Sequence, residues 1–165
     1  MTATPRLALP FLSAGQAQKE FTVNESLQTL DILVGGSVED GPLATPPASP
    51  AIGQAYIVDL TPSGEWAGHP ASVAAYSSGG WQFVAPVDGI SLYVKSLGEW
   101  AVYRAGAWDI GLLRGSSLII GGQQVVGSRG AAIGSATGGT TIDSEARTAI
   151  DQILAAMRQH GLIES

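Results

Sequence analysis

The chain has 165 residues, which suits one compact domain or two very small ones, and it has no cysteine, which excludes disulfides and thiolate metal sites. Eight basic residues against fourteen acidic ones give a formal charge of −6. A chain without a basic excess fits neither nucleic-acid binding nor attraction to an anionic membrane surface.

Residues 1–20 are predicted to form an extended arm, because Pro5 and Pro10 disfavour a helix. We expect this arm to bury little against its own domain, to be dispensable for folding and to serve in attachment. The candidate attachment residues are Arg6, Leu9 and Phe11. Pro10 also interrupts the only N-terminal apolar run, so we expect no export signal and assembly in the cytoplasm. No apolar stretch approaches the roughly 20 residues of a membrane-spanning helix, so we expect no membrane insertion.

A short helix is predicted over residues 24–34. Asn24 can cap it, Gly35-Gly36 can end it, and apolar residues recur at the spacing of one helix face. Those apolar residues are Leu27, Leu30, Leu33 and Val34. Residues 41–53 hold four prolines and are predicted to form a linker or a rigid polar loop.

From residue 54 to residue 110 the pattern favours short β-strands separated by turn residues. The predicted strands cover residues 54–58, 72–76, 81–85, 90–94, 99–103 and 107–110. Gly-Glu-Trp-Ala occurs at residues 64–67 and again at 98–101, and each copy is followed by Tyr-x-x-Gly-x-Trp. The pattern predicts two related hairpin units, at about 56–84 and 93–110, in which Tyr76 meets Trp81 and Tyr103 meets Trp108 across the strands.

Residues 111–140 form a Gly-rich tract with predicted strands at 117–120 and 123–126, and a helix is predicted over 144–160. Asp143 can cap this helix, Gly161 can end it, and an apolar stripe runs along it. The candidate oligomerisation residues on the stripe are Ile150, Ile153, Leu154 and Met157. The stripe must bury against either the chain's own β domain or the same helix of neighbouring copies.

These elements predict a mainly β fold with two helices, built from small antiparallel β units (tandem aromatic hairpins). The parts are an arm with a short helix (1–40), a Pro-rich linker (41–53), an aromatic β domain (54–110), and a Gly-rich tract with a C-terminal amphipathic helix (111–165). The low charge and the Gly-rich tract indicate that copies of the chain bury part of each other's surface in an oligomer, because the cores of oligomer interfaces are depleted in charged residues.

No catalytic or metal-binding constellation stands out in the sequence, so we expect no enzyme activity, no metal and no cofactor. His69 and His160 lack neighbours at metal-ligand spacing. Glu65 and Glu99 precede Trp66 and Trp100 in the two repeats. They could form a glycosidase-like pair, but a repeated turn also explains a repeated Glu.

The four tryptophans could likewise form either a surface that stacks on sugars or part of the hydrophobic core. Trp81 and Trp108 close the turns and are predicted to be core residues. Trp66 and Trp100, with Glu65 and Glu99, are the candidate glycan contacts.

Several strings in residues 6–110 resemble, in order, a bacteriophage-derived domain of uncharacterised function found in alphaproteobacterial prophages and gene transfer agents. They are the opening Leu-Ala-Leu-Pro-Phe-Leu and Gly-Gln-Ala-Gln-Lys-Glu, then residues 43–50, 53–58, 66–69 and 84–89. Residues 121–163 are similar to the tails of virion fibre and spike proteins, through residues 124–129, 138–140 and the helix ending Arg-x-His-Gly-Leu-Ile.

The resemblance implies a structural protein of a phage-like particle: a head spike or its base, attached to the capsid or another virion protein and anchoring a cell-surface-binding fibre. It implies a homo-oligomer on the particle surface, with a pentamer favoured over a trimer. The alternatives are a spike that contacts the recipient's capsular polysaccharide directly, a glycan-cleaving spike, and a tail or baseplate component.

Overall fold

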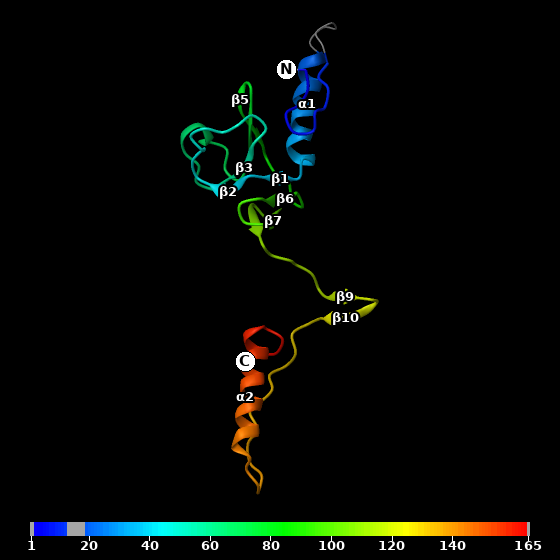
Figure 1. Ribbon diagram of the computed structural model, residues 1–165, viewed down its shortest axis with the longest axis vertical. Helices are drawn as coiled ribbons and strands as arrows, with labels where there is room; N and C mark the ends of the chain where they lie inside the picture. The colour runs from blue at the N-terminus through cyan, green and yellow to red at the C-terminus, as the bar shows by residue number, and fades with distance from the viewer. Residues whose placement is uncertain (1, 13–18, 165) are drawn as a thin grey trace. The chain divides into compact units, whose positions relative to one another are not determined.

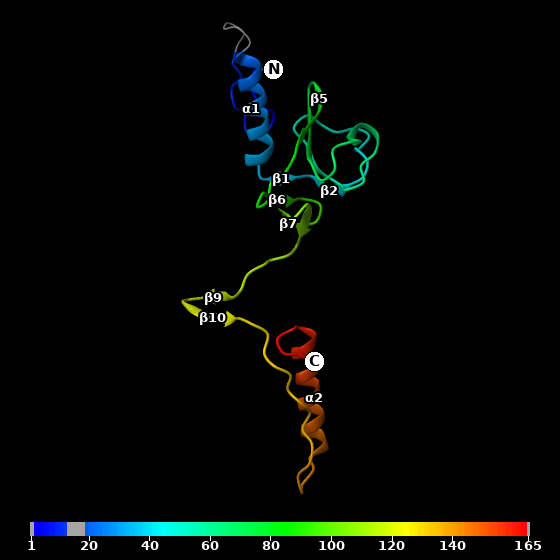
Figure 2. The ribbon, with the colours of Figure 1, turned by 180° about the vertical axis from the view of Figure 1, so that it is seen from behind.

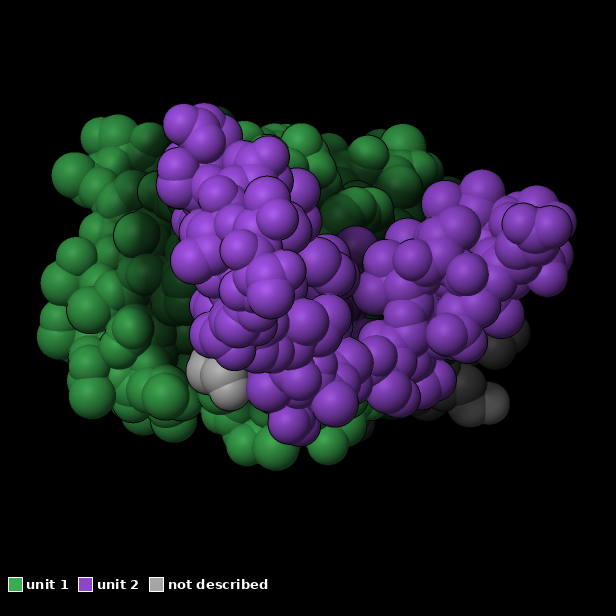
Figure 3. Space-filling view, turned by 90° about the horizontal axis from the view of Figure 1, so that it is seen from below, with its two compact units in different colours: residues 1–112 green, residues 113–165 purple. Residues whose placement is uncertain are grey.

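The computed structural model describes residues 2–12 and 19–164 of the chain. It divides into two compact units, residues 1–112 and residues 113–165, which Figure 3 colours separately. The fold is mainly β, with ten strands, an N-terminal helix and a C-terminal helix among the described residues, which confirms the predicted fold class. None of the described helices has the length and apolar character needed to cross a bilayer.

The N-terminal helix α1 spans Lys19–Val34 and so contains Asn24 within it. The prediction that Asn24 caps the helix is wrong. Its side chain instead accepts a hydrogen bond from the backbone N–H of Leu12 (2.9 Å) and donates one to the Leu12 carbonyl (3.2 Å). The predicted apolar stripe is also only partly correct: Leu30 and Val34 are exposed, and the fully buried residues of the helix are Asp31 and Ile32. The helix does end at Gly35-Gly36, where Gly36 takes a positive φ of 64°.

Two four-stranded sheets follow α1, and Figures 1 and 2 show most of their strands from opposite sides. The first has the order β2-β3-β4-β5, formed by Asp40–Leu43, Ala55–Val58, Val73–Ser77 and Gly80–Val84. The second has the order β1-β6-β7-β8, formed by Ser37–Val38, Ser91–Val94, Glu99–Arg104 and Ala107–Ile110. The six strands predicted between residues 54 and 110 are all present, each within one residue of the expected ends.

The two strands that sequence analysis missed, β1 and β2, share one short segment and run parallel to β6 and β3 respectively. Glu39 lies between them and donates its backbone N–H to the Ala55 carbonyl (2.7 Å). This segment therefore adds one strand to each sheet. Residues 41–43, assigned above to the Pro-rich linker, belong to β2 and lie within the first unit.

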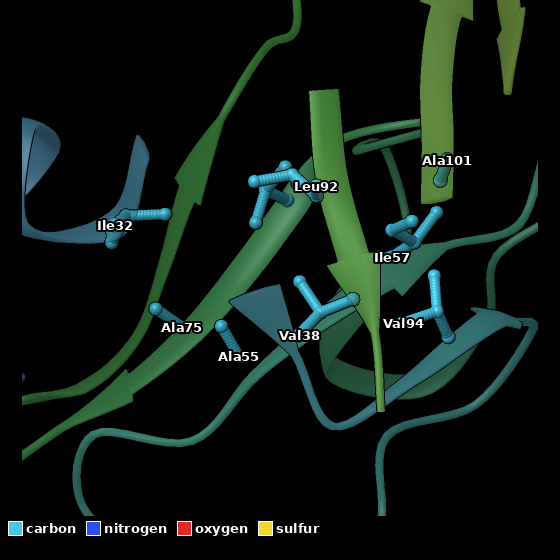
Figure 4. Close-up of a cluster of buried hydrophobic side chains, with 9 residues drawn as sticks. Ile32, Val38, Ala55, Ile57, Ala75, Leu92, Val94 and Ala101 are labelled. Atoms are coloured by element: carbon cyan, nitrogen blue, oxygen red, sulfur yellow. The ribbon is translucent and has the colours of Figure 1, made fainter. Parts of the chain in front are cut away.

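The main core contains small aliphatic side chains from both sheets together with Ile32 of α1 (Figure 4). It is formed by Ile32, Val38, Ala55, Ile57, Val73, Ala75, Leu92, Val94 and Ala101. All four residues of β3 are buried, because the opposite face of this strand packs against a second, aromatic cluster.

The second unit contains the hairpin of β9 (Leu118–Ile120) and β10 (Gln123–Val126) and the helix α2 (Ser144–Gln159), as predicted. The Asp143 carboxylate accepts a hydrogen bond from the backbone N–H of Ala146 (2.8 Å) and so caps α2. At the other end, Leu162 N–H donates to the Met157 carbonyl and Gly161 N–H to the Arg158 carbonyl (2.9 Å each). These two bonds close the helix in a Schellman motif, with Gly161 at φ 68°, so the helix ends at Gly161 as predicted.

Residues 129–138, called the strap below, are held to α2 and to the residues that follow it. The guanidinium groups of Arg147 and Arg158 donate to the carbonyls of Gly138 and Ile133. At its beginning, the strap forms a parallel bridge between Gly130 and Ile163. Because both arginines project from α2, they orient the strap along the helix.

Candidate functional site

The aromatic cluster on the first sheet is built around Trp66, which lies in the short 3-10 helix η1 (Gly64–Trp66). Trp66 is 0% exposed and packs against Tyr56 and Trp81, with ring centroids 6.1 Å and 5.1 Å away. The hypothesis that Trp66 stacks on a sugar is therefore wrong, because its ring has no solvent-exposed surface. Its indole Nε1 is buried and has no hydrogen-bond partner among the residues that the structure describes.

Glu65 remains exposed beside this cluster, where its carboxylate accepts a hydrogen bond from the Trp81 indole Nε1 (3.2 Å). Trp81 is half-buried and also packs edge-on against Tyr76. The ring of His69 stacks on that of Phe83, with centroids 3.7 Å apart and planes 2° from parallel. The rim of the cluster therefore combines aromatic edges with one carboxylate.

The repeated Tyr-x-x-Gly-x-Trp motif forms the same contact in both sheets, as predicted. Tyr76 lies opposite Trp81 in the β4–β5 hairpin, with ring centroids 5.0 Å apart. Tyr103 lies opposite Trp108 in the β7–β8 hairpin, at 5.3 Å. Both pairs are edge-to-face, an arrangement that stabilises cross-strand packing beyond the area it buries.

The second copy of Gly-Glu-Trp-Ala does not fold like the first, because its Glu99, Trp100 and Ala101 lie in strand β7. Trp100 faces Tyr93 of β6 across the sheet, edge-to-face at 5.7 Å. Trp100 is 56% exposed and Tyr93 is 36% exposed, so together they form an aromatic surface. We call this pair the Tyr93–Trp100 surface.

The two candidate carboxylates have different surroundings. Glu65 follows Gly64 in η1 and contacts Trp81. Glu99 is the first residue of β7, and its carboxylate lies so close to Gly111 that a side chain at position 111 would clash with it. Their equivalence in the repeat is therefore one of sequence and not of structure. Among the residues that the structure describes, no group of three or more His, Cys, Asp or Glu side chains is arranged to hold a metal ion.

The predicted arm is folded onto α1, at least over the described residues 2–12, which we call the N-terminal clasp. Thr4 and Asp31 are both buried, and the Thr4 hydroxyl donates to the Asp31 carboxylate at 2.7 Å. The backbone N–H groups of Arg6 and Leu7 donate to the same carboxylate at 3.0 Å and 2.6 Å. The expectation that this segment buries little against its own domain is wrong; residues 13–18 of the predicted arm lie outside the described residues.

Of the three candidate attachment residues, Arg6 has a role inside the chain. Its guanidinium donates to the carbonyls of Ile32 and Ser37, at the C-terminal end of α1 and just beyond it. Burial lowers the pKa of Arg6, and the nearby charges of Asp31 and Glu39 oppose that change. Leu9 and Phe11 are half-buried, and Phe11 lines a cavity of about 50 Å³ beside α1. That volume holds a few water molecules but not a sugar ring.

The candidate oligomerisation residues on α2 divide into two groups. Leu154 is 5% exposed and Met157 is half-buried. Ile150 and Ile153 are 42% and 60% exposed, so the chain itself leaves much of the stripe uncovered. Gln152 and Gln159 are exposed, whereas Arg147 is half-buried because it binds the strap.

A family model described as a protein of unknown function (DUF2793) matches residues 23–109. The chain belongs to the DUF2793 family. The matched region runs from within α1 to β8 and therefore includes both sheets, both aromatic pairs and the Tyr93–Trp100 surface. The N-terminal clasp and the whole second unit of this DUF2793 protein lie outside it. No curated protein matches the chain.

Proposed function

We propose that this DUF2793 protein is a structural component of a phage-like particle, a gene transfer agent, in which it forms a head spike or the base of one. It attaches to the capsid and anchors a fibre that binds the recipient cell. Its role is to assemble on the particle and to display the fibre, and not to catalyse a reaction. It is assembled in the cytoplasm and then lies on the particle surface. The ordered strings shared with phage-derived and virion fibre sequences support the proposal.

The observation that carries the proposal is the amount of apolar surface that residues 113–165 leave exposed. Leu154 and Ile163 are the large apolar residues buried there, among the residues described. The exposed ones are Leu113, Leu118, Ile119, Ile120, Val125, Val126, Ile133, Ile142, Ile150, Ile153 and Leu162. Five of them lie together in the β9–β10 hairpin. Clustered exposed apolar residues mark an interaction site in a soluble protein, so we propose that the second unit makes the chain a homo-oligomer.

Particle composition tests this function. Particles purified from producing cells should contain the protein, and antibodies against it should label the capsid surface in electron micrographs. A deletion strain should yield particles without that label and without spike density. Label at the tail tip would favour the tail or baseplate alternative, and purified particles free of the protein would contradict the whole proposal.

Direct contact with a capsular polysaccharide is a second candidate function, supported by the Tyr93–Trp100 surface. An exposed aromatic face suits the C–H face of a pyranose, and Trp100 is the most exposed of the four tryptophans. On a glycan array, binding that is lost in Trp100→Ala and kept in Ile52→Ala, a change at another exposed apolar residue of the first unit, would support it. No binding by the wild-type protein would exclude this candidate and leave the anchoring role intact.

A further inference from the structure

Among the described residues of the second unit, no layer covers the β9–β10 hairpin. Its strands pair with each other in a two-stranded sheet (Figure 1). Every one of their residues is exposed. A two-stranded hairpin is marginally stable in water unless another layer or strand packs against it. The hairpin therefore needs a partner surface that the described chain does not supply.

Apolar side chains lie on both faces of this hairpin. Leu118 pairs with Val126, and Ile120 pairs with Gln123, whereas Ile119 pairs with Gln124. Because side chains alternate along a strand, Leu118, Ile120 and Val126 share one face, here called the wide face. Ile119 lies on the opposite, narrow face. These four apolar residues are between 46% and 62% exposed, so neither face is covered.

The charges of the chain favour a second copy as the partner. Residues 113–165 carry four arginines and four acidic residues, and residues 115–128, which include the hairpin, carry no charge at all. Residues 1–112 carry four basic and ten acidic residues and therefore hold the whole net charge of −6. Copies of the second unit can meet without net repulsion, whereas copies of the first unit repel each other.

We infer that copies of the chain pack head to tail around one rotation axis, with the wide face of each hairpin against the narrow face of the next, in a ring of three or more. The inference rests on the homo-oligomer of the proposed function and specifies its interface. A two-fold pair presents the same patch from both partners, so it would cover one face of each hairpin and leave the other in water. A ring with unlike faces in contact covers both.

Charge substitutions on the two faces of the full-length protein test this arrangement by sedimentation velocity at micromolar concentration. Ile119→Lys and Ile120→Asp should each put an unpaired charge into every interface and weaken assembly at least tenfold. The double variant carries both changes in one chain, so each introduced lysine meets an introduced aspartate of the neighbour. It should recover much of the lost assembly. Ser116→Lys, an exposed change just before the hairpin, is the matched control and should assemble like the wild type.

The other outcomes each overturn the inference. A double variant weaker than either single variant would mean that like faces meet. If the single variants assemble normally, the interface lies outside the hairpin, and the homo-oligomer of the proposed function still stands. If the wild-type protein is monomeric but is present in purified particles, the ring is contradicted and the proposed role in the particle still stands. Tryptophan fluorescence controls for folding of the first unit, because all four tryptophans lie within residues 1–112.

Discussion

The hydroxyl of Thr4 donates a hydrogen bond to the carboxylate of Asp31 across 27 residues of chain, at 2.7 Å and out of contact with solvent. The backbone N–H groups of Arg6 and Leu7 donate to the same carboxylate. Asp31 thus satisfies three donors of the N-terminal clasp, two of which are main-chain N–H groups. The clasp is therefore part of the folded unit, and Asp31 accepts more of its hydrogen bonds than any other side chain that the structure describes.

We predict that Asp31→Ala lowers the free energy of unfolding of the first unit by about 2–4 kcal/mol, because it leaves buried donors without an acceptor. Guanidinium denaturation followed by tryptophan fluorescence measures the change. Glu25→Ala, at an exposed carboxylate on the same helix, is the control and should shift stability by less than about 0.5 kcal/mol. Deletion of residues 1–12 should destabilise the unit at least as much as Asp31→Ala; an unchanged melting curve for the truncated chain would show that the clasp contributes nothing.

The two tryptophans that follow Glu in the repeat should respond in opposite ways to truncation. Trp66→Ala removes a fully buried ring that touches Tyr56 and Trp81, and should cost about 3–5 kcal/mol. Trp100→Ala removes a ring that is mostly in water and should cost less than about 1 kcal/mol. Thermal unfolding followed by far-ultraviolet circular dichroism compares them directly. Equal losses in the two variants would contradict the difference in burial.

This contrast also shows where sequence reasoning reached its limit. The strands and the Tyr–Trp contacts could be predicted, because residues at a fixed short spacing across a tight turn must lie opposite each other. The fate of Gly-Glu-Trp-Ala could not, since Gly64, Glu65 and Trp66 form η1 in the first copy, whereas Glu99, Trp100 and Ala101 lie in strand β7 in the second. The segment between the Trp and the following Tyr is seven residues longer in the first copy than in the second. This longer segment allows Trp66 to fold into the aromatic cluster.

Strands β1 and β2 and the N-terminal clasp could not be predicted either, because contacts between residues distant in sequence define them. Strand β1 has two residues and β2 contains Gly41-Pro42, so neither has a recognisable strand pattern. Both exist because strands β6 and β3 offer free edges to the segment after α1. The clasp likewise depends on Asp31, whose importance becomes visible only when residues 4–7 are placed beside it. The helix α2 was predictable because its cap, stripe and terminal glycine are all local.

The turn between β7 and β8 carries a local strain that a substitution can relieve. Ala105 has a positive φ of 49° and precedes Gly106, at 89°. Two-residue hairpin turns of this kind favour Asn or Gly at both positions, because a Cβ is disfavoured in the left-handed region. We predict that Ala105→Gly raises stability by up to about 1 kcal/mol, measured by denaturant unfolding. Ala107→Gly, at the strand position two residues later, should lower it; stabilisation by both changes would mean that turn strain is not the cause.

The last prediction concerns the exposed stripe of α2, and in particular Ile153, which is 60% exposed in the chain. Ala146, Ile150, Ile153 and Met157 recur at spacings of four, three and four, which is the seam of a coiled coil. If copies of α2 pack along this seam, Ile153→Asp places a charge in every interface and should dissociate the oligomer while leaving the β signal unchanged. Sedimentation equilibrium at several concentrations measures the loss.

Two controls distinguish this effect from unfolding. Gln152→Asp introduces the same charge at an exposed polar position of the same helix turn and should leave the oligomer intact. Leu154→Ala truncates the buried neighbour and should destabilise the second unit at every protein concentration, by about 2–3 kcal/mol. Subunit linkage makes melting depend on protomer concentration, so the helical signal of wild-type protein should melt at higher temperature as concentration rises, and that dependence should vanish in Ile153→Asp. If Ile153→Asp assembles as the wild type does, the stripe lies outside the interface, and the apolar surface of α2 serves some other partner.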